Sequence, residues 1–68
     1  MKPLTAKEVE EYLKDYGFIL GRVRGSHFGW YNPENGRTAV VPHHGNRAIP
    51  QGTLISIFNG AGIPKPQR

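Results

Sequence analysis

Gly25-Ser26-His27 follows two arginines, Arg22 and Arg24, and lies between two segments that suit β-strands. Histidine is the only side chain whose unperturbed pKa lies near neutrality, so it can accept or donate a proton at cellular pH. Arginine carries a planar, permanently charged group that binds phosphate oxygens. These residue types indicate phosphate chemistry, and His27 is the residue that we expect to perform it.

Cleavage of RNA is one reaction that such residues can carry out without a metal ion. A base removes the proton of the RNA 2′-hydroxyl, charge builds on the phosphoryl oxygens, and an acid protonates the leaving 5′-oxygen. Neutral His27 suits the first step, and Arg22 and Arg24 suit the binding of phosphate. The alternative is a surface histidine in a turn beside ordinary arginines, which the spacing alone does not exclude.

The aromatic residues of the segment after Ser26 divide between two faces. Alternation along a strand places Phe28 and Trp30 on one face, where we expect them to join the core. It places Tyr31 with His27 on the other face. Tyr31 is therefore the better candidate for stacking on an unpaired base.

Other polar residues are weaker candidates for contacts with RNA. Ser26 can bind phosphate, although a serine in a turn more often bonds local backbone. His44, Arg37 and Arg47 can add contacts, with a loop or solvated surface role as the alternative for each. His43 and His44 are adjacent and point opposite ways in an extended segment, so they are poor joint ligands, and we expect no metal site.

The 68 residues suffice for one domain, 1–68, and a domain of this size buries only about 60% of the surface that its unfolded chain exposes. Such a thin core favours an open active surface and no small-molecule cofactor. Without cysteine, neither a disulfide framework nor a thiolate zinc site is available. No apolar run approaches the ~20 residues that span a bilayer, and we expect a cytoplasmic protein with no membrane partner.

Charge is distributed unevenly along the chain. Up to Asp15, three lysines and four acidic residues give a net charge of −1, and from Tyr16 onward six basic residues and the single acid Glu34 give +5. The basic part favours a polyanionic partner, nucleic acid first, because neutralised phosphates release counterions. Charge that only keeps the protein soluble is the alternative.

Two amphipathic helices are predicted, one near each end of the chain. Thr5-Ala6-Lys7-Glu8 has the form of a capping box, and apolar residues then recur at helical spacing until Gly17 ends the pattern. Pro50 can begin a second helix, in which the same spacing gives residues 54–61 one apolar face. The tail, about 64–68, should be flexible.

Three strands are predicted between the helices. Residues 18–24 and 27–31 are rich in β-branched, aliphatic and aromatic side chains, and Gly25-Ser26 between them suits a hairpin turn. Asn35-Gly36 signals a second reversal before a third strand at 37–41. Three consecutive strands of this kind form an antiparallel meander.

The first strand contains a conflict that predicts an irregularity. Strict alternation would place Arg22 and Arg24 on the same face as Phe18 and Leu20, which would aim charge at the core. Because glycine marks bulges in strands, we predict a bulge or bend at Gly21 that breaks this register.

The predicted order is α-β-β-β-α, an α+β fold in which a three-stranded antiparallel sheet holds both helices on one face. The opposite face of the sheet is then free to meet a ligand. With its motifs in this order, the chain resembles HicA-type toxins, the mRNA interferases of HicA–HicB toxin–antitoxin pairs. The resemblance covers nearly the whole chain and rests on Gly17-Phe18, Arg22 with Arg24, Gly25-Ser26-His27, Val41-Pro42 with His44-Gly45, Gly52-Thr53-Leu54 and Ala61-Gly62-Ile63.

The resemblance implies a fold like that of double-stranded-RNA-binding domains, metal-independent cleavage of mRNA by a single histidine, and a HicB-like antitoxin that covers the active surface of this type II toxin. The family's catalytic histidine falls on His27. Many members have a second histidine directly after it, where this chain has Phe28. A non-catalytic RNA-binding module of the same shape is the alternative function, and a purely protein-binding domain, which predicts no salt-dependent affinity for RNA, is a third.

Overall fold

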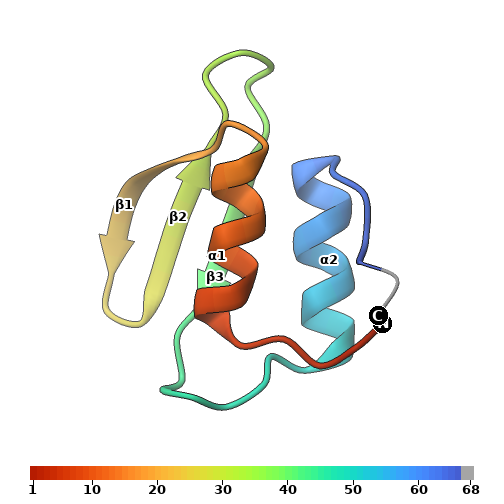
Figure 1. The fold of residues 1–68 in the computed structure, drawn as a ribbon. Helices are drawn as coiled ribbons and strands as arrows, with labels where there is room; N and C mark the ends of the chain where they lie inside the picture. Colours follow the sequence, from red (N-terminus) through yellow and green to blue (C-terminus); the bar gives the residue numbers. More distant parts are fainter. Residues whose placement is uncertain (67–68) are drawn as a thin grey trace.

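Two helices flank three strands in the computed structural model, which describes residues 1–66. Helix α1 spans Ala6–Asp15, the strands β1, β2 and β3 span Ile19–Arg24, His27–Tyr31 and Thr38–Pro42, and helix α2 spans Gln51–Ala61 (Figure 1). The predicted α-β-β-β-α order is confirmed. Residues 67–68 of the predicted flexible tail lie outside the described residues. Neither helix of this described part is long and apolar enough to cross a membrane.

The strands form one antiparallel sheet in the order β1-β2-β3, so β2 is the central strand. Helices α1 and α2 run side by side on one face of this sheet, with α2 packed against β3 (Figure 1). Strand β1 lies beyond α1 at the edge, and all of its residues are exposed. The two helices therefore cover β2 and β3 from one side and leave the opposite face of the sheet open.

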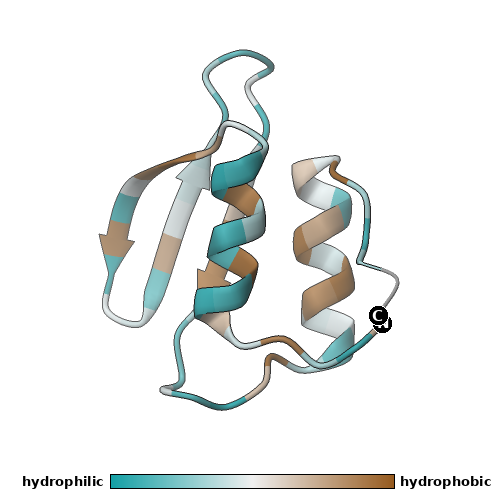
Figure 2. Ribbon diagram, in the orientation of Figure 1, coloured by the Kyte–Doolittle hydropathy of each residue, from teal (hydrophilic) through white to brown (hydrophobic). Residues whose placement is uncertain are grey.

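Apolar side chains from both helices and from the inner strands form one core. The fully buried members include Val9 and Leu13 of α1, Leu54 and Phe58 of α2, and Val41 of β3. Figure 2 shows apolar residues on α2 and on one side of α1, whose other side is hydrophilic. Burial stabilises each such side chain by roughly 1.5–3 kcal/mol relative to exposure, so this core fixes the sheet that carries the open face.

Local sequence sets the bounds of α1. The amide of Glu8 donates to Thr5 Oγ1 at 3.3 Å, and the amide of Thr5 donates to Glu8 Oε1 at 2.8 Å, which confirms the capping box. Gly17 has a φ of 89°, a conformation that glycine adopts without strain, and the helix ends before it. The chain then leads through the buried Phe18 into β1.

Strand β1 contains the predicted bulge. Leu20 pairs with Trp30, and Arg22 pairs with Gly29, which is adjacent to Trp30 on β2. Gly21 therefore has no partner of its own. The extra residue reverses the alternation, and the later part of the strand turns its arginines to the open face. The conflict between charge and core is resolved at this glycine.

A buried asparagine anchors the loop between β2 and β3. Asn32 is only 5% exposed; its Nδ2 atom donates to the carbonyl of Tyr16 at 3.0 Å, and its Oδ1 atom accepts from the amide of Glu34 at 2.9 Å. These bonds tie the end of β2 to the end of α1. They also shape the reversal that leads to β3.

Candidate functional site

Three rows of residues cross the open face of the sheet, because paired residues on neighbouring strands share a face and so do residues two apart on one strand. The strand register gives the histidine row (Arg24, His27, Pro42), the glycine row (Arg22, Gly29, Val40) and the tyrosine row (Ile19, Tyr31, Thr38). All but one of these residues would project a side chain from the open face. The exception is Gly29, at the centre of the sheet.

His27 lies beside both arginines that the sequence analysis paired with it. Arg22, Arg24 and His27, with Gly29 and Val40, line a shallow depression of about 150 Å³, which we call the histidine hollow. The side chains of all three ionisable residues are exposed. Within residues 1–66 neither arginine forms an ion pair, and no acidic residue lines this hollow. The hollow thus combines one imidazole with uncompensated positive charge.

The turn between β1 and β2 sets the position of His27. Gly25, with a φ of 59°, and Ser26 form this turn, and Arg24 and His27 face each other at its base. The carbonyl of Ser26 accepts from the amide of His43 at 2.7 Å. Ser26 is exposed and adjoins the histidine hollow without lining it.

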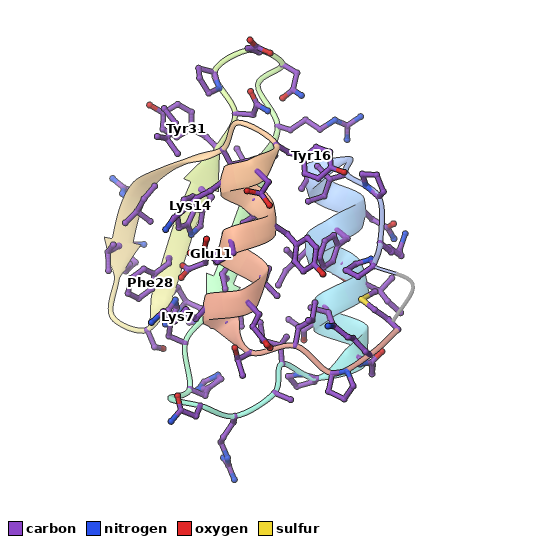
Figure 3. All side chains as sticks on the ribbon, viewed as in Figure 1. Lys7, Glu11, Lys14, Tyr16, Phe28 and Tyr31 are labelled. Atoms are coloured by element: carbon purple, nitrogen blue, oxygen red, sulfur yellow. The ribbon has the colours of Figure 1, made fainter. Side chains whose placement is uncertain are left out.

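A second, larger depression adjoins the first and shares Arg22, Gly29 and Val40 with it. We call it the tyrosine hollow; it measures about 400 Å³, and Tyr31 lines it with its half-exposed ring. The ring lies over the bulge, since a Cβ atom at Gly21 would be 3.0 Å from Cδ1 of Tyr31. Figure 3 shows Tyr31 at the end of β2 that is remote from the β1–β2 turn.

The remaining predicted contact residues lie outside both hollows. Arg37 extends over the C-terminal end of α2, where its Nη1 atom is 3.5 Å from the carbonyl oxygen of Gly60. A cation there interacts favourably with the free carbonyl groups of the helix end. His44 and Arg47 are exposed in the loop after β3, and the amide of Arg47 donates to the carbonyl of His44 at 3.3 Å. The structure brings these three together neither with His27 nor with Tyr31.

The family comparison covers this whole arrangement. The sequence model of the family described as HicA toxin of bacterial toxin-antitoxin matches residues 6–63, from the first turn of α1 to just beyond α2. The chain belongs to the HicA toxin family. The resemblance inferred from the motifs is thereby confirmed, and membership implies an antitoxin as partner. A search of curated proteins returned no match.

A buried polar cluster that was not predicted from the sequence supports the sheet from its covered face. Oε2 of Glu10, a residue that is only 9% exposed, accepts from Trp30 Nε1 at 2.8 Å and lies 2.9 Å from Nε2 of His43. The imidazole is not aligned for a hydrogen bond to this oxygen, and its buried Nε2 atom has no other partner within the described residues. Glu10 and His43 form an ion pair when the imidazole is protonated.

This cluster reaches the turn that carries His27. The ring of His43 packs on Phe28 with 4.0 Å between the centroids, and the amide of His43 holds the carbonyl of Ser26. One signal in the sequence pointed to the cluster: Glu10 lies four residues after Ala6 and three before Leu13, on the buried side of α1. A carboxylate on a buried helix face requires a polar partner.

A metal site in a protein needs several ligating side chains close together. Within residues 1–66, no group of three or more His, Cys, Asp or Glu side chains is close enough together to hold a metal ion.

Proposed function

We propose that this member of the HicA toxin family is an endoribonuclease that cleaves mRNA without a metal ion, with His27 as its single catalytic histidine. The observation that carries the proposal is the histidine hollow, in which an exposed imidazole and two guanidinium groups lie on an open face of the sheet. Among residues 1–66, no acidic side chain pairs with either arginine. Phosphate oxygens are the ligands that such charge favours.

The proposed reaction uses the RNA as its own nucleophile. Neutral His27 removes the proton of the 2′-hydroxyl, whose oxygen attacks the adjacent phosphorus while Arg22 and Arg24 bind the phosphoryl oxygens. The bond to the 5′-oxygen breaks, and protonated His27 returns the proton to that leaving oxygen, directly or through water. The products are a 2′,3′-cyclic phosphate and a 5′-hydroxyl. His44 lies outside the hollow, so we assign it no proton transfer.

We also propose contacts for the other residues that the sequence indicated. Tyr31, two rows from His27 on the same strand, is proposed to contact an RNA base. Ser26, at the turn, and His44 and Arg47, in the loop after β3, are proposed to contact flanking phosphates. Arg37 is the weakest candidate, because the end of α2 already engages its guanidinium.

We propose that a HicB-like antitoxin neutralises the toxin by covering the open face. Ile19, Tyr31 and Val40 expose apolar surface there beside the two arginines, a combination that suits contact with another protein. Access of RNA to His27 would then be blocked physically.

A non-catalytic RNA-binding module is the competing function, since the same arginines would bind RNA whether or not His27 acts. The deciding experiment incubates labelled single-stranded RNA with the protein in excess chelator and compares wild type, His27→Ala and His44→Ala. We expect cyclic phosphate and 5′-hydroxyl ends with wild type and, with weaker binding of RNA but the same product ends, with His44→Ala. We expect intact RNA with His27→Ala. RNA that is bound but intact with all three proteins would leave only the binding module.

A further inference from the structure

The tyrosine hollow exists because two glycines take the place of side chains on the open face. Gly29 occupies the centre of the sheet, between Arg22 and Val40 in the glycine row, and adds no side chain there. A Cβ atom at this position would lie 3.2 Å from the carbonyl oxygen of Arg22. Gly21, at the bulge, leaves room for the ring of Tyr31, which a Cβ atom there would approach to 3.0 Å. The result is an apolar depression of about 400 Å³ with an aromatic wall.

The two hollows form one continuous path along β2. His27 and Tyr31 lie on the same face, with the glycine row between them. At about 3.3 Å per residue, their Cα atoms are roughly 13 Å apart. Arg22 lines both hollows, so a phosphate held by this arginine is adjacent to the tyrosine hollow as well as to His27.

We propose that the tyrosine hollow is a nucleobase subsite, in which an unpaired base of the RNA adjacent to the cleaved phosphate stacks on Tyr31 over Gly29. The inference rests on the proposed ribonuclease function. It adds the location at which the base next to the cleaved phosphate is held. Because every base has a flat π-face, stacking of this kind tolerates different bases. Thr38 also lines the hollow and carries a side-chain hydroxyl, a group that can hydrogen-bond to a base edge.

Charge and shape favour RNA over an apolar protein side chain as the occupant. The hollow is apolar where Tyr31 and Val40 line it but opens directly onto Arg22, so an occupant that joins a flat apolar group to an anion satisfies both parts. A nucleotide has this composition. Single-stranded substrate is required, because bases in a duplex are already stacked and paired.

The test measures binding in the His27→Ala background, so that the RNA stays intact. A short single-stranded RNA is titrated against this variant alone and combined with Tyr31→Ala, Tyr31→Phe or Tyr16→Ala. Tyr16 is the matched control because it is also about half exposed but lies at the end of α1, on the other side of that helix from Tyr31 (Figure 3). Loss of one stacked base should weaken binding roughly 5- to 150-fold. We expect this loss for Tyr31→Ala, and near-normal affinity for Tyr31→Phe and Tyr16→Ala.

A second measurement locates the base. The same RNA is prepared with an abasic nucleotide at each position in turn and titrated against the His27→Ala protein with and without the Tyr31→Ala substitution. One abasic position should weaken binding to the protein that retains Tyr31 and have little further effect on the protein that lacks it. Equal affinities of the Tyr31→Ala and Tyr16→Ala proteins would overturn the subsite while leaving the ribonuclease proposal intact. The same conclusion would follow if, at every abasic position, the loss of affinity were as large in the Tyr31→Ala protein as in the protein that retains Tyr31. Absence of RNA binding by any protein would overturn both.

Discussion

The two faces of the three-stranded sheet carry different kinds of residues on the same strands. On the covered face, Trp30 and Val41 are buried beneath the helices, and the buried carboxylate of Glu10 on α1 accepts a hydrogen bond from the indole of Trp30. On the open face, His27 is exposed beside arginines that form no ion pair within the described residues. Neighbours along one strand thus belong to different environments.

Because of this difference, a substitution on one face should affect the stability of the protein and a substitution on the other face its activity. A side chain on the covered face contributes through burial, and its loss leaves a cavity or an unpaired polar group. A side chain on the open face contributes little to folding, and its loss should appear in function. Pairs of similar residues on opposite faces therefore make the sharpest tests.

The largest difference is expected between the two histidines His27 and His43. His27→Ala should reduce the rate of RNA cleavage by about 10²- to 10⁴-fold, the usual contribution of a general acid or base, with no change in the thermal midpoint. His43→Ala removes a packed ring from the covered face and should lower the free energy of unfolding by about 1 kcal/mol. Cleavage assays and thermal melts of both variants check this, and a His27→Ala protein that melts as early as His43→Ala would contradict the separation.

Val40 and Val41 give a matched pair of the same residue type on one strand. Val41 is fully buried and Val40 is 55% exposed. Val41→Ala should lower the free energy of unfolding by about 2–3 kcal/mol, from lost burial and the cavity that remains, and Val40→Ala by less than about 0.5 kcal/mol. Urea denaturation measures both values. Similar losses at the two positions would show that the open face is covered in solution.

Glu10 and Glu11 are neighbours on α1 with opposite surroundings. Glu10→Ala leaves the buried indole N–H of Trp30 without its acceptor and should cost about 1–3 kcal/mol of stability. Glu11 forms an exposed ion pair with Lys14 at 3.3 Å, and Glu11→Ala should cost less than about 0.5 kcal/mol. Chemical denaturation tests the pair, with Glu10→Gln, which keeps an acceptor oxygen, as the variant expected to recover part of the loss.

The smallest effect is expected in the salt dependence of RNA binding. An arginine that neutralises one phosphate of a single strand contributes about 0.7 to the slope of log K against log salt. Arg22→Ala and Arg24→Ala should each reduce the slope by this amount, whereas Arg37→Ala should not, because its guanidinium lies at the end of α2. Titrations at several salt concentrations measure the slope. An equal reduction with Arg37→Ala would extend the RNA path beyond the open face.

Much of the fold was predictable because its signals are local. The capping box at Thr5 and the glycine after α1 depend on a few neighbouring residues, and the structure has both. The bulge at Gly21 was predictable for another reason: charge on the face of Phe18 would have been buried, and glycine marked the only break available. The pairing of His27 with nearby arginines followed from the hairpin turn that connects them.

Contacts between distant segments were not predictable in this way. The buried cluster joins Glu10 of α1, Trp30 of β2 and His43 of the loop after β3. Oε2 of Glu10 reaches the other two side chains only when α1 packs on the sheet. Arg37 was grouped with the phosphate-binding residues on charge, but the packing of α2 places the end of that helix beneath its guanidinium.

The sequence by itself determined the element order, the start of each helix, the bulge and the two arginines beside His27, because periodicity, caps and turn chemistry act over a few residues. Only the tertiary structure decided that the two hollows adjoin through Gly29, that His44 and Arg47 stand apart from them, and that Glu10 supports the sheet from behind. These relations depend on the strand register and on how the helices pack, which join residues far apart in the chain.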